Sequence, residues 1–290
     1  MLNIRSRKRT HTMTKILNAD AITQYEQEGY YFPLRILDDA QVTANRKQLE
    51  DFETTQGKAL EGAQRSKAHL LFKWVDDLMR HSTILNAVED LIGPDILCWN
   101  TIFWIKEATS QSFVSWHQDL RYWGLDSDKL VSVWLALSSA THESGCMCVL
   151  PGSHKDDLLP HNDQYDTDNL LTRGQEISAQ VNDAETVTMS LEPGEISLHN
   201  VRLAHASGPN KSKDRRIGIS MHYMPTSTKQ MVGDWDSAAL VRGTDNFGHF
   251  AITPRPMKDF DPAAVSFHRK ATNATRKILF KDAERVRPTV

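Results

Sequence analysis

The spacing of apolar residues along the chain changes near residue 96. Before that point apolar positions recur at helical intervals in residues 18–57 and again in residues 67–91, which end at the helix-stopping run Ile92-Gly93-Pro94. After it, short segments rich in β-branched and aromatic residues are separated by turn residues. The pattern therefore predicts N-terminal helices followed by a β-rich body.

Seven segments of the second part are predicted strands, because each is short, rich in β-favouring residues and bounded by turn signals. They are residues 96–106, 113–120, 131–138, 146–150, 186–191, 195–200 and 217–224. A series of this kind is typical of a sandwich or small barrel. The predicted fold class is mainly β with flanking helices (α+β).

Two further segments lack the strand pattern. Residues 155–185 are polar and too long for a hairpin connection, which predicts a lid or an excursion with a short helix of its own, the plain alternative being a solvated surface loop. The aromatic-containing tail, residues 225–290, is expected to pack over the barrel. We therefore expect one domain over residues 15–290, and a disordered leader in the basic residues 1–14.

Composition narrows the classes of partner. A hydrophobic content of 40% in 290 residues supports a substantial core, and a net charge of −3 gives no positive surplus for nucleic acid. No apolar run approaches the length of a membrane span. The sparse cysteines Cys98, Cys146 and Cys148 indicate reduced thiols and a cytoplasmic location. An enzyme acting on a small molecule fits best, and the oligomeric state stays open.

A His-x-Asp pattern occurs three times, and its surroundings distinguish the copies. Those beginning at His154 and His161 lie among prolines, glycine and polar residues that signal loops. His117 and Asp119 lie instead in the β-favouring run from residue 112 to residue 120. On an extended strand, residues two apart point to the same face, so this pair can hold one metal ion together.

A third ligand is needed, and His205 is the best candidate. Two histidines and one carboxylate on one face of an ion leave the opposite positions open, as in non-haem Fe(II) oxygenases. His199 is a rival that the period of two does not eliminate, since residues 199 and 205 share a strand face.

Arg216 follows His205 by eleven positions, across a turn-forming run of glycine, proline, asparagine and lysine. We expect a hairpin that returns Arg216 beside His205, with Ser207 on the same strand face as His205. A guanidinium binds a carboxylate through two parallel hydrogen bonds. A five-carbon diacid would span from such a clamp to the metal.

Three blocks of the chain resemble the phytanoyl-CoA dioxygenase (PhyH) family of Fe(II)/2-oxoglutarate enzymes. They are Trp116-His117-Gln118-Asp119 with residues 131–137, the run Gly145-Cys146-Met147-Cys148-Val149-Leu150-Pro151-Gly152-Ser153-His154-Lys155, and residues 205–216. The resemblance extends from about Tyr25 to Pro225. It implies a double-stranded β-helix, a cupin-like jelly roll with iron inside one end of the barrel.

The resemblance also implies roles for individual residues. It makes His117, Asp119 and His205 the iron ligands, and it places Arg216 with Ser207 on the distal carboxylate of 2-oxoglutarate. The implied cofactors are Fe(II), with 2-oxoglutarate and O2 as co-substrates.

Three further co-substrate contacts are implied by the same resemblance: Trp134 as a pocket-lining residue, Gln118, and Lys73 in a region that matches less well. Halogenating relatives carry a small residue in place of the metal-binding acid. Asp119 occupies that position here, which favours hydroxylation.

The sequence is thus interpreted as an Fe(II)/2-oxoglutarate-dependent dioxygenase. It would hydroxylate an unactivated C–H bond of a small metabolite (an amino acid, phosphonate, osmolyte or natural-product intermediate) and release succinate and CO2. Desaturation is an alternative outcome of the same chemistry. From other classes, a cupin-like metal-binding isomerase and a non-catalytic small-molecule binder are alternatives, but neither needs the Arg216 clamp.

Substrate specificity is expected to reside in residues 155–185, residues 99–104 and the tail after Pro225, which the resemblance covers poorly. Aromatic residues near the site are expected to pack the barrel, with a cage for a cationic substrate as the alternative. They are Trp99, Trp104, Trp116, Tyr122 and Trp123. His222 is expected to be a satisfied core residue, with a barrel-lining position as the alternative.

Overall fold

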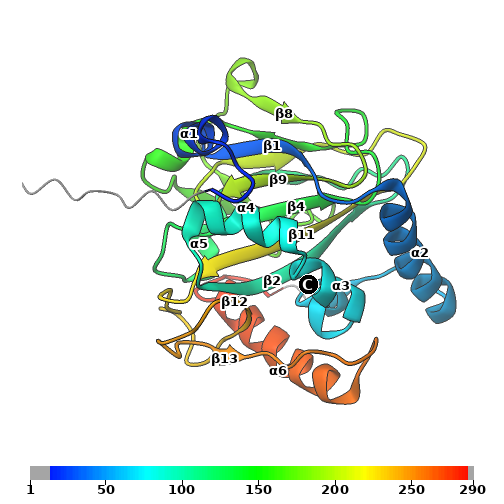
Figure 1. Cartoon of the computed structure of the whole chain (residues 1–290). Helices are drawn as coiled ribbons and strands as arrows, with labels where there is room; N and C mark the ends of the chain where they lie inside the picture. The colour runs from blue at the N-terminus through cyan, green and yellow to red at the C-terminus, as the bar shows by residue number, and fades with distance from the viewer. Residues whose placement is uncertain (1–13, 287–290) are drawn as a thin grey trace, which may run out of the picture.

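The computed structural model describes residues 14–286, so the predicted leader lies almost entirely outside the described residues. Two sheets form the body of the protein (Figure 1). The large sheet has the strand order β1-β9-β4-β11-β2-β12-β13 and the small sheet the order β3-β10-β5-β8. This is the predicted mainly β fold with flanking helices.

The strands of the large sheet are β1 (Tyr30–Arg35), β2 (Ile96–Lys106), β4 (Val131–Ala136), β9 (Glu195–Asn200), β11 (Arg216–Pro225), β12 (Ser237–Arg242) and β13 (Ala251–Ile252). Those of the small sheet are β3 (Val114–His117), β5 (Met147–Val149), β8 (Val187–Met189) and β10 (His205–Ser207). The helices are α1 (Ala19–Glu28), α2 (Asp39–Gln56), α3 (Lys73–Met79), α4 (Ser82–Ile92), α5 (Leu120–Trp123) and α6 (Pro262–Leu279). Short 3-10 turns are η1 (Gly62–Arg65), η2 (Ala68–Leu70), η3 (Ser153–Lys155) and η4 (Asp183–Glu185).

The N-terminal helices cover one face of the large sheet, as Figure 1 shows for α3 and α4. Helix α2 begins where a capping box is formed, with Asp38 and Gln41 each accepting a backbone hydrogen bond from the other residue. Helix α4 ends at Ile92 before Gly93, as the sequence predicts. Because helices cover this face and the small sheet lies over the other, β4 is buried along its whole length.

Strand boundaries show where sequence patterns were sufficient. The bounds of β2 and β9 agree with the predicted strands 96–106 and 195–200. The predicted strand 113–120 is too long, since β3 ends at His117 and the chain turns into α5. Strands β1 and β12 lie in segments where we predicted none.

The excursion at residues 155–185 contains a small hairpin of its own, β6 (His161–Asp163) paired with β7 (Gln175–Ile177), and only the single turn η4 is helical. It packs on the small sheet. The hydroxyl of Ser115 donates a hydrogen bond to the carbonyl of Gln175 and accepts one from the amide of Asn169. The segment therefore supports β3 from behind.

The tail extends the large sheet. Strand β12 pairs with β2, and α6 crosses below it in Figure 1. Over the part of the chain that the structure describes, no helix combines the length and apolarity needed to cross a bilayer.

Gly218 on β11 leaves the space that the Trp134 ring occupies. A Cβ built on Gly218 would lie 1.9 Å from a carbon of that ring, far inside contact distance. We expect Gly218→Ala to displace the indole and to lower the free energy of unfolding by about 1–3 kcal/mol, the usual cost of overpacking. Chemical denaturation measures this. Gly208→Ala is the matched control, because a Cβ there meets nothing within 4 Å; equal losses in both variants would contradict the prediction.

Candidate metal centre and co-substrate cavity

Two histidines lie side by side on adjacent strands of the small sheet. His205 on β10 is the direct antiparallel partner of His117 on β3, and their ring centroids are 4.1 Å apart. Each Nδ1 donates to the carbonyl two residues earlier, that of Ser115 and that of Leu203, both at 2.9 Å. These bonds fix the tautomer and leave both Nε2 lone pairs free to bind a metal.

Asp119 completes the group, although not from a strand. Its backbone is already helical, at the start of α5. One ligand atom each from His117, Asp119 and His205 lies within 4.8 Å of the others, and Nε2 of His117 is 3.4 Å from the carboxylate. Among the described residues, this is the group of histidine, cysteine and acidic side chains placed to hold an ion.

The ionisation states of the group suit a metal. Burial alone would raise the pKa of Asp119, but the close contact of its carboxylate with His117, together with the nearby histidines, lowers it overall. Burial, followed by the charge of His117, lowers the pKa of His205 to about 4. An ionised carboxylate and a neutral imidazole are the forms that coordinate metals.

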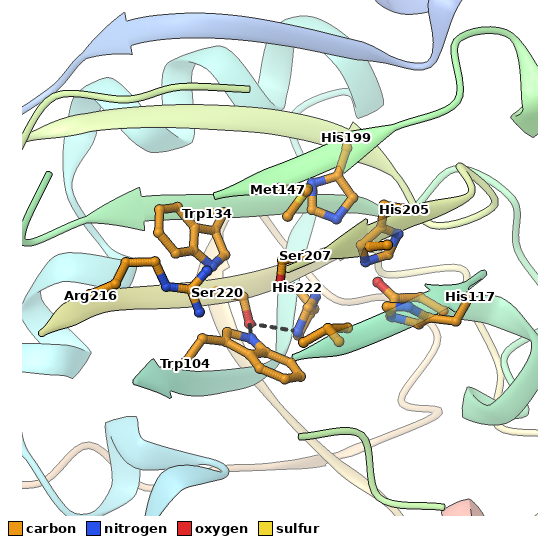
Figure 2. A pocket seen from close by; sticks show the side chains of 13 residues that line it. Trp104, His117, Trp134, Met147, His199, His205, Ser207, Arg216, Ser220 and His222 are labelled. Atoms are coloured by element: carbon orange, nitrogen blue, oxygen red, sulfur yellow. Dashed lines mark hydrogen bonds and ion pairs between the residues drawn. The ribbon is translucent and has the colours of Figure 1, made fainter. Parts of the chain in front are cut away.

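A chain of hydrogen bonds runs from the cavity wall to Asp119, and Figure 2 shows its first members, Trp104, Ser220 and His222. The indole of Trp104 donates to Ser220 Oγ at 2.9 Å, and Ser220 Oγ is 3.0 Å from Nε2 of His222. Nδ1 of His222 is 2.9 Å from Ser132 Oγ, which donates to Asp119 at 3.5 Å. Each serine hydroxyl has one proton to donate. When His222 is neutral, Ser220 donates to its Nε2, its Nδ1 donates to Ser132, and Ser132 donates to Asp119. His222 lines the cavity with both nitrogens bonded, as expected for a satisfied residue.

His199 also lines this cavity, with its ring 4.9 Å from that of His205. Its Nδ1 has no hydrogen-bond partner, and burial holds its pKa well below the usual range. It stands beside the three-residue group without belonging to it. A lone neutral histidine there adds polarity to the wall next to the metal ligands.

The opposite end of the cavity is cationic. Arg216 is 3% exposed, its guanidinium lies over the Trp134 ring at 5.3 Å, and it donates to the carbonyl of Gly145 at 2.9 Å. Its Nε has no partner, although it is buried. Figure 2 shows Arg216 and Trp134 at one end of the cavity and His117 and His205 at the other. An unbalanced buried guanidinium is costly, so this end is suited to an anion.

The predicted hairpin between His205 and Arg216 is wrong. Strand β10 pairs with β3 and β5 in the small sheet, whereas β11 pairs with β2 and β4 in the large one. The connection carries the chain from one sheet to the other. His205 and Arg216 therefore line the same cavity from its two walls.

Lys106 is a second buried cation that the sequence reasoning missed. It is the register partner of Arg216 on β2, and its Nζ donates to Ser207 Oγ at 2.7 Å and to the carbonyl of Gly208. Burial, followed by the charge of Arg216, lowers its pKa to about 6. The available signal was its position two residues after Trp104, on the same face of a strand that is mostly apolar.

Two implied co-substrate contacts lie elsewhere. Gln118 points away from the cavity, donating to the carbonyl of Arg202 at 2.7 Å and accepting from the backbone of Leu159 at 2.8 Å. Lys73 lies at the start of α3, where its exposed ammonium pairs with Asp77. Neither side chain lines the cavity. Gln118 instead ties β3 to the loops behind it.

A jelly-roll cavity with two histidines and a carboxylate placed to hold an ion at one end, and a buried guanidinium opposite, is typical of a class of protein, the non-haem Fe(II)/2-oxoglutarate oxygenases. Comparison with known proteins gives the family. The model for phytanoyl-CoA dioxygenase (PhyH) matches residues 14–218, and the chain belongs to this family.

Relatives and solved structures agree with this class. The chain is 26% identical over 193 residues to a probable alpha-ketoglutarate-dependent hypophosphite dioxygenase of Stutzerimonas stutzeri, covering 66% of this chain and 67% of the relative. It is 27% identical to human peroxisomal phytanoyl-CoA dioxygenase, covering 69% and 66%. The apo structure of the non-haem monooxygenase ThoJ superposes with a TM-score of 0.79 at 34% identity, covering 90% of this chain and 98% of ThoJ. The protein is a non-haem dioxygenase that uses Fe(II) and 2-oxoglutarate.

Single substitutions distinguish a ligand histidine from its neighbour. We expect His205→Ala to weaken iron binding by more than the about 10- to 100-fold that loss of an outer-shell partner costs, because a direct ligand is removed. His199→Ala, the matched control on the same wall, should retain iron. Metal content after dialysis at fixed free iron, together with the melting temperature, measures both. Loss of iron in His199→Ala with retention in His205→Ala would reverse the assignment.

Proposed function

We propose that this dioxygenase hydroxylates a C–H bond of a small metabolite, with His117, Asp119 and His205 holding the iron and Arg216 and Lys106 holding the co-substrate. The observation that carries the proposal is the opposition of charge in one cavity. A carboxylate and two imidazoles occupy one end, and the buried guanidinium of Arg216 occupies the other, where the Ser207 hydroxyl accepts a hydrogen bond from the buried Lys106. 2-Oxoglutarate has the complementary form, with a metal-chelating keto acid at one end and a second carboxylate at the other.

The distal carboxylate is assigned to the guanidinium of Arg216, the ammonium of Lys106 and the hydroxyl of Ser207. The partnerless Nε of Arg216 and the Lys106–Ser207 hydrogen bond supply the donors. Trp134 fixes the plane of the guanidinium by stacking, and Gly218 gives the indole its room. When bound, the iron and 2-oxoglutarate supply the oxidative chemistry, with O2 consumed and succinate and CO2 released.

The residues of the chain position and shield this chemistry. Val114 and Met147 close the cavity with apolar surface between its two ends, which excludes water from the reacting centre. The chain of hydrogen bonds that ends at Ser132 restrains the outer oxygen of Asp119. Asp119 is itself a carboxylate, so it fills the position that a halogenating enzyme would keep for chloride. We therefore propose hydroxylation.

The alternatives from other classes are disfavoured by the cationic end. A metal-dependent isomerase or a non-catalytic binder has no need of a buried guanidinium across the cavity from the metal. Arg216 forms no ion pair with any described residue and its Nε has no partner, so a bound anion would compensate its burial.

We also propose a cytoplasmic location and no nucleic-acid partner. The support is three free cysteines, Cys98, Cys146 and Cys148, and a net charge of −3.

Anaerobic addition of Fe(II) and 2-oxoglutarate should produce the visible charge-transfer band of the chelate. In Arg216→Ala we expect an affinity for 2-oxoglutarate lower by about 10- to 100-fold, because charge-assisted hydrogen bonds are lost, with iron content little changed. Titration of the band and metal analysis measure the two effects separately. Absence of the band in folded wild-type protein would favour the binder, and equal loss of iron in Arg216→Ala would count against its role.

The depressed pKa of Lys106 predicts a pH dependence of co-substrate binding. Above about pH 6 the free enzyme carries this amine neutral, whereas a bound carboxylate favours its charged form, so binding takes up a proton. The dissociation constant of 2-oxoglutarate should therefore rise with pH, by up to about tenfold per unit. Lys106→Met should bind more weakly at pH 6 and lack this added slope. Anaerobic titrations from pH 6 to 9 test it, and parallel slopes would refute it.

A further inference from the structure

A second cavity, of about 650 Å³, adjoins the metal cavity on the far side of Trp104. Trp104 lines both cavities and is the residue they share. The volume falls in the range of small-molecule sites. Its walls come from η1, from residues 100–104 of β2, from residues 165–172 and from α6 with the residues after it. The last three are the segments in which we expected specificity to reside.

The lining of this outer cavity is cationic and polar. It contains the guanidinium groups of Arg65, Arg276 and Arg285, and over the described residues no aspartate or glutamate lines it. Asparagine and threonine side chains supply further hydrogen-bonding groups, and a few apolar residues complete the wall. Such a lining attracts anions and repels cations.

Arg65 is the best-defined of the three. Its Nε donates to the carbonyl of Leu60 at 3.0 Å, which orients the group, and the terminal nitrogens make no hydrogen bond to any described residue. Burial, only partly offset by the field of nearby carboxylates, lowers its pKa. A half-buried guanidinium with two unused nitrogens is a ready partner for a carboxylate or phosphate-type group.

The carboxylates whose field reaches Arg65 are already engaged. Glu53 and Glu107 both pair with Arg215, at 2.5 and 2.7 Å, and Glu61 pairs with Lys58 at 2.6 Å. None forms an ion pair with Arg65. The positive charge is therefore left facing the cavity.

Thr275 on α6 gives independent support. Its side chain is 3% exposed and lines the cavity, and its hydroxyl has no hydrogen-bond partner. A buried hydroxyl without a partner is unusual in a native protein and calls for a ligand or water. Arg276, the next residue of α6, lines the same cavity.

We propose that this outer cavity binds the primary substrate and that the substrate is an organic anion. Its carboxylate or phosphate-type group would lie between Arg65 and α6, and its carbon skeleton would extend past Trp104 toward the iron. The inference rests on the proposed function, because it assigns the substrate of the same site. It excludes the cationic or quaternary-ammonium substrate that an aromatic cage would favour. Trp99 and Trp123, two members of that imagined cage, pack on each other at 4.9 Å instead.

Anion binding can be measured without knowing the substrate. The probes are inorganic phosphate, methylphosphonate and acetate, added to enzyme holding Mn(II) and saturating 2-oxoglutarate, which blocks the inner cationic end. The paramagnetic ion speeds the ³¹P or ¹³C relaxation of a bound probe nearby. We expect enhancement in the wild type and an affinity about 10- to 100-fold lower in Arg65→Gln. The preferred probe identifies a phosphate-type or carboxylate substrate.

The controls separate the possible failures. Lys277→Gln removes one positive charge from an exposed position of α6 outside the cavity and should bind the probes as the wild type does. If Arg65→Gln does not fold, the nearly isosteric Thr275→Val takes its place as the test, and it should weaken probe binding several-fold. The Fe(II)/2-oxoglutarate band, recorded first on each variant, tests the proposed function on its own. A normal band with no probe binding, or with binding unaffected by both cavity variants, overturns the anionic substrate alone.

Discussion

The pairing of β3 with β10 is the constraint on which the site depends. It places His117 directly opposite His205, so two imidazoles lie in contact inside a barrel. If both were protonated, their positive charges would repel each other. The backbone carbonyls of Ser115 and Leu203 take the Nδ1 protons and turn both lone pairs inward. Asp119 supplies the only negative charge of the group. The ladder thus fixes the two imidazoles, and the hydrogen bond from Ser132 restrains the carboxylate of Asp119 beside them.

The basic groups at the other end of the cavity are positioned by a different strand pairing, that of β11 with β2. Arg216 and Lys106 are partners in the β11–β2 ladder, so a guanidinium and an amine are held side by side and buried together. Burial and the charge of Arg216 lower the pKa of Lys106, and a bound anion would favour its charged form. The two ladders belong to different sheets, and the separation of the sheets sets the length of the molecule that satisfies both ends.

Sequence patterns predicted what depends on local periodicity. Strand β2 and strand β9 have the predicted bounds because their apolar runs end at clear turn signals. The rule of two also placed His117 and Asp119 toward one cavity, even though the strand ends between them. The same rule places Gln118 on the opposite side, which is why its side chain does not line the cavity.

Long-range pairing could not be read from the chain. The turn residues after Ser207 suggested a hairpin, but the strand that follows found its partners in β2 and β4, more than eighty residues earlier. Lys73 was chosen from a weak match, whereas Lys106 lies beside Arg216 and bonds Ser207 because β2 is the neighbour of β11. Which lysine lies beside Arg216 is a matter of sheet order, and sheet order is set by packing over the whole domain.

The division between sheets and connections bears on how the enzyme acquires a substrate. The residues that we propose to hold the metal and the co-substrate lie on paired strands or directly after one, where the ladders fix their positions. The outer cavity is bounded mainly by a 3-10 turn, a loop and a C-terminal helix, whose side chains change without disturbing those ladders. Trp104 belongs to both regions, since it lines the outer cavity and begins the hydrogen bonds that lead to Asp119. A substrate that contacts this indole is therefore linked to Asp119 by a chain of four hydrogen bonds.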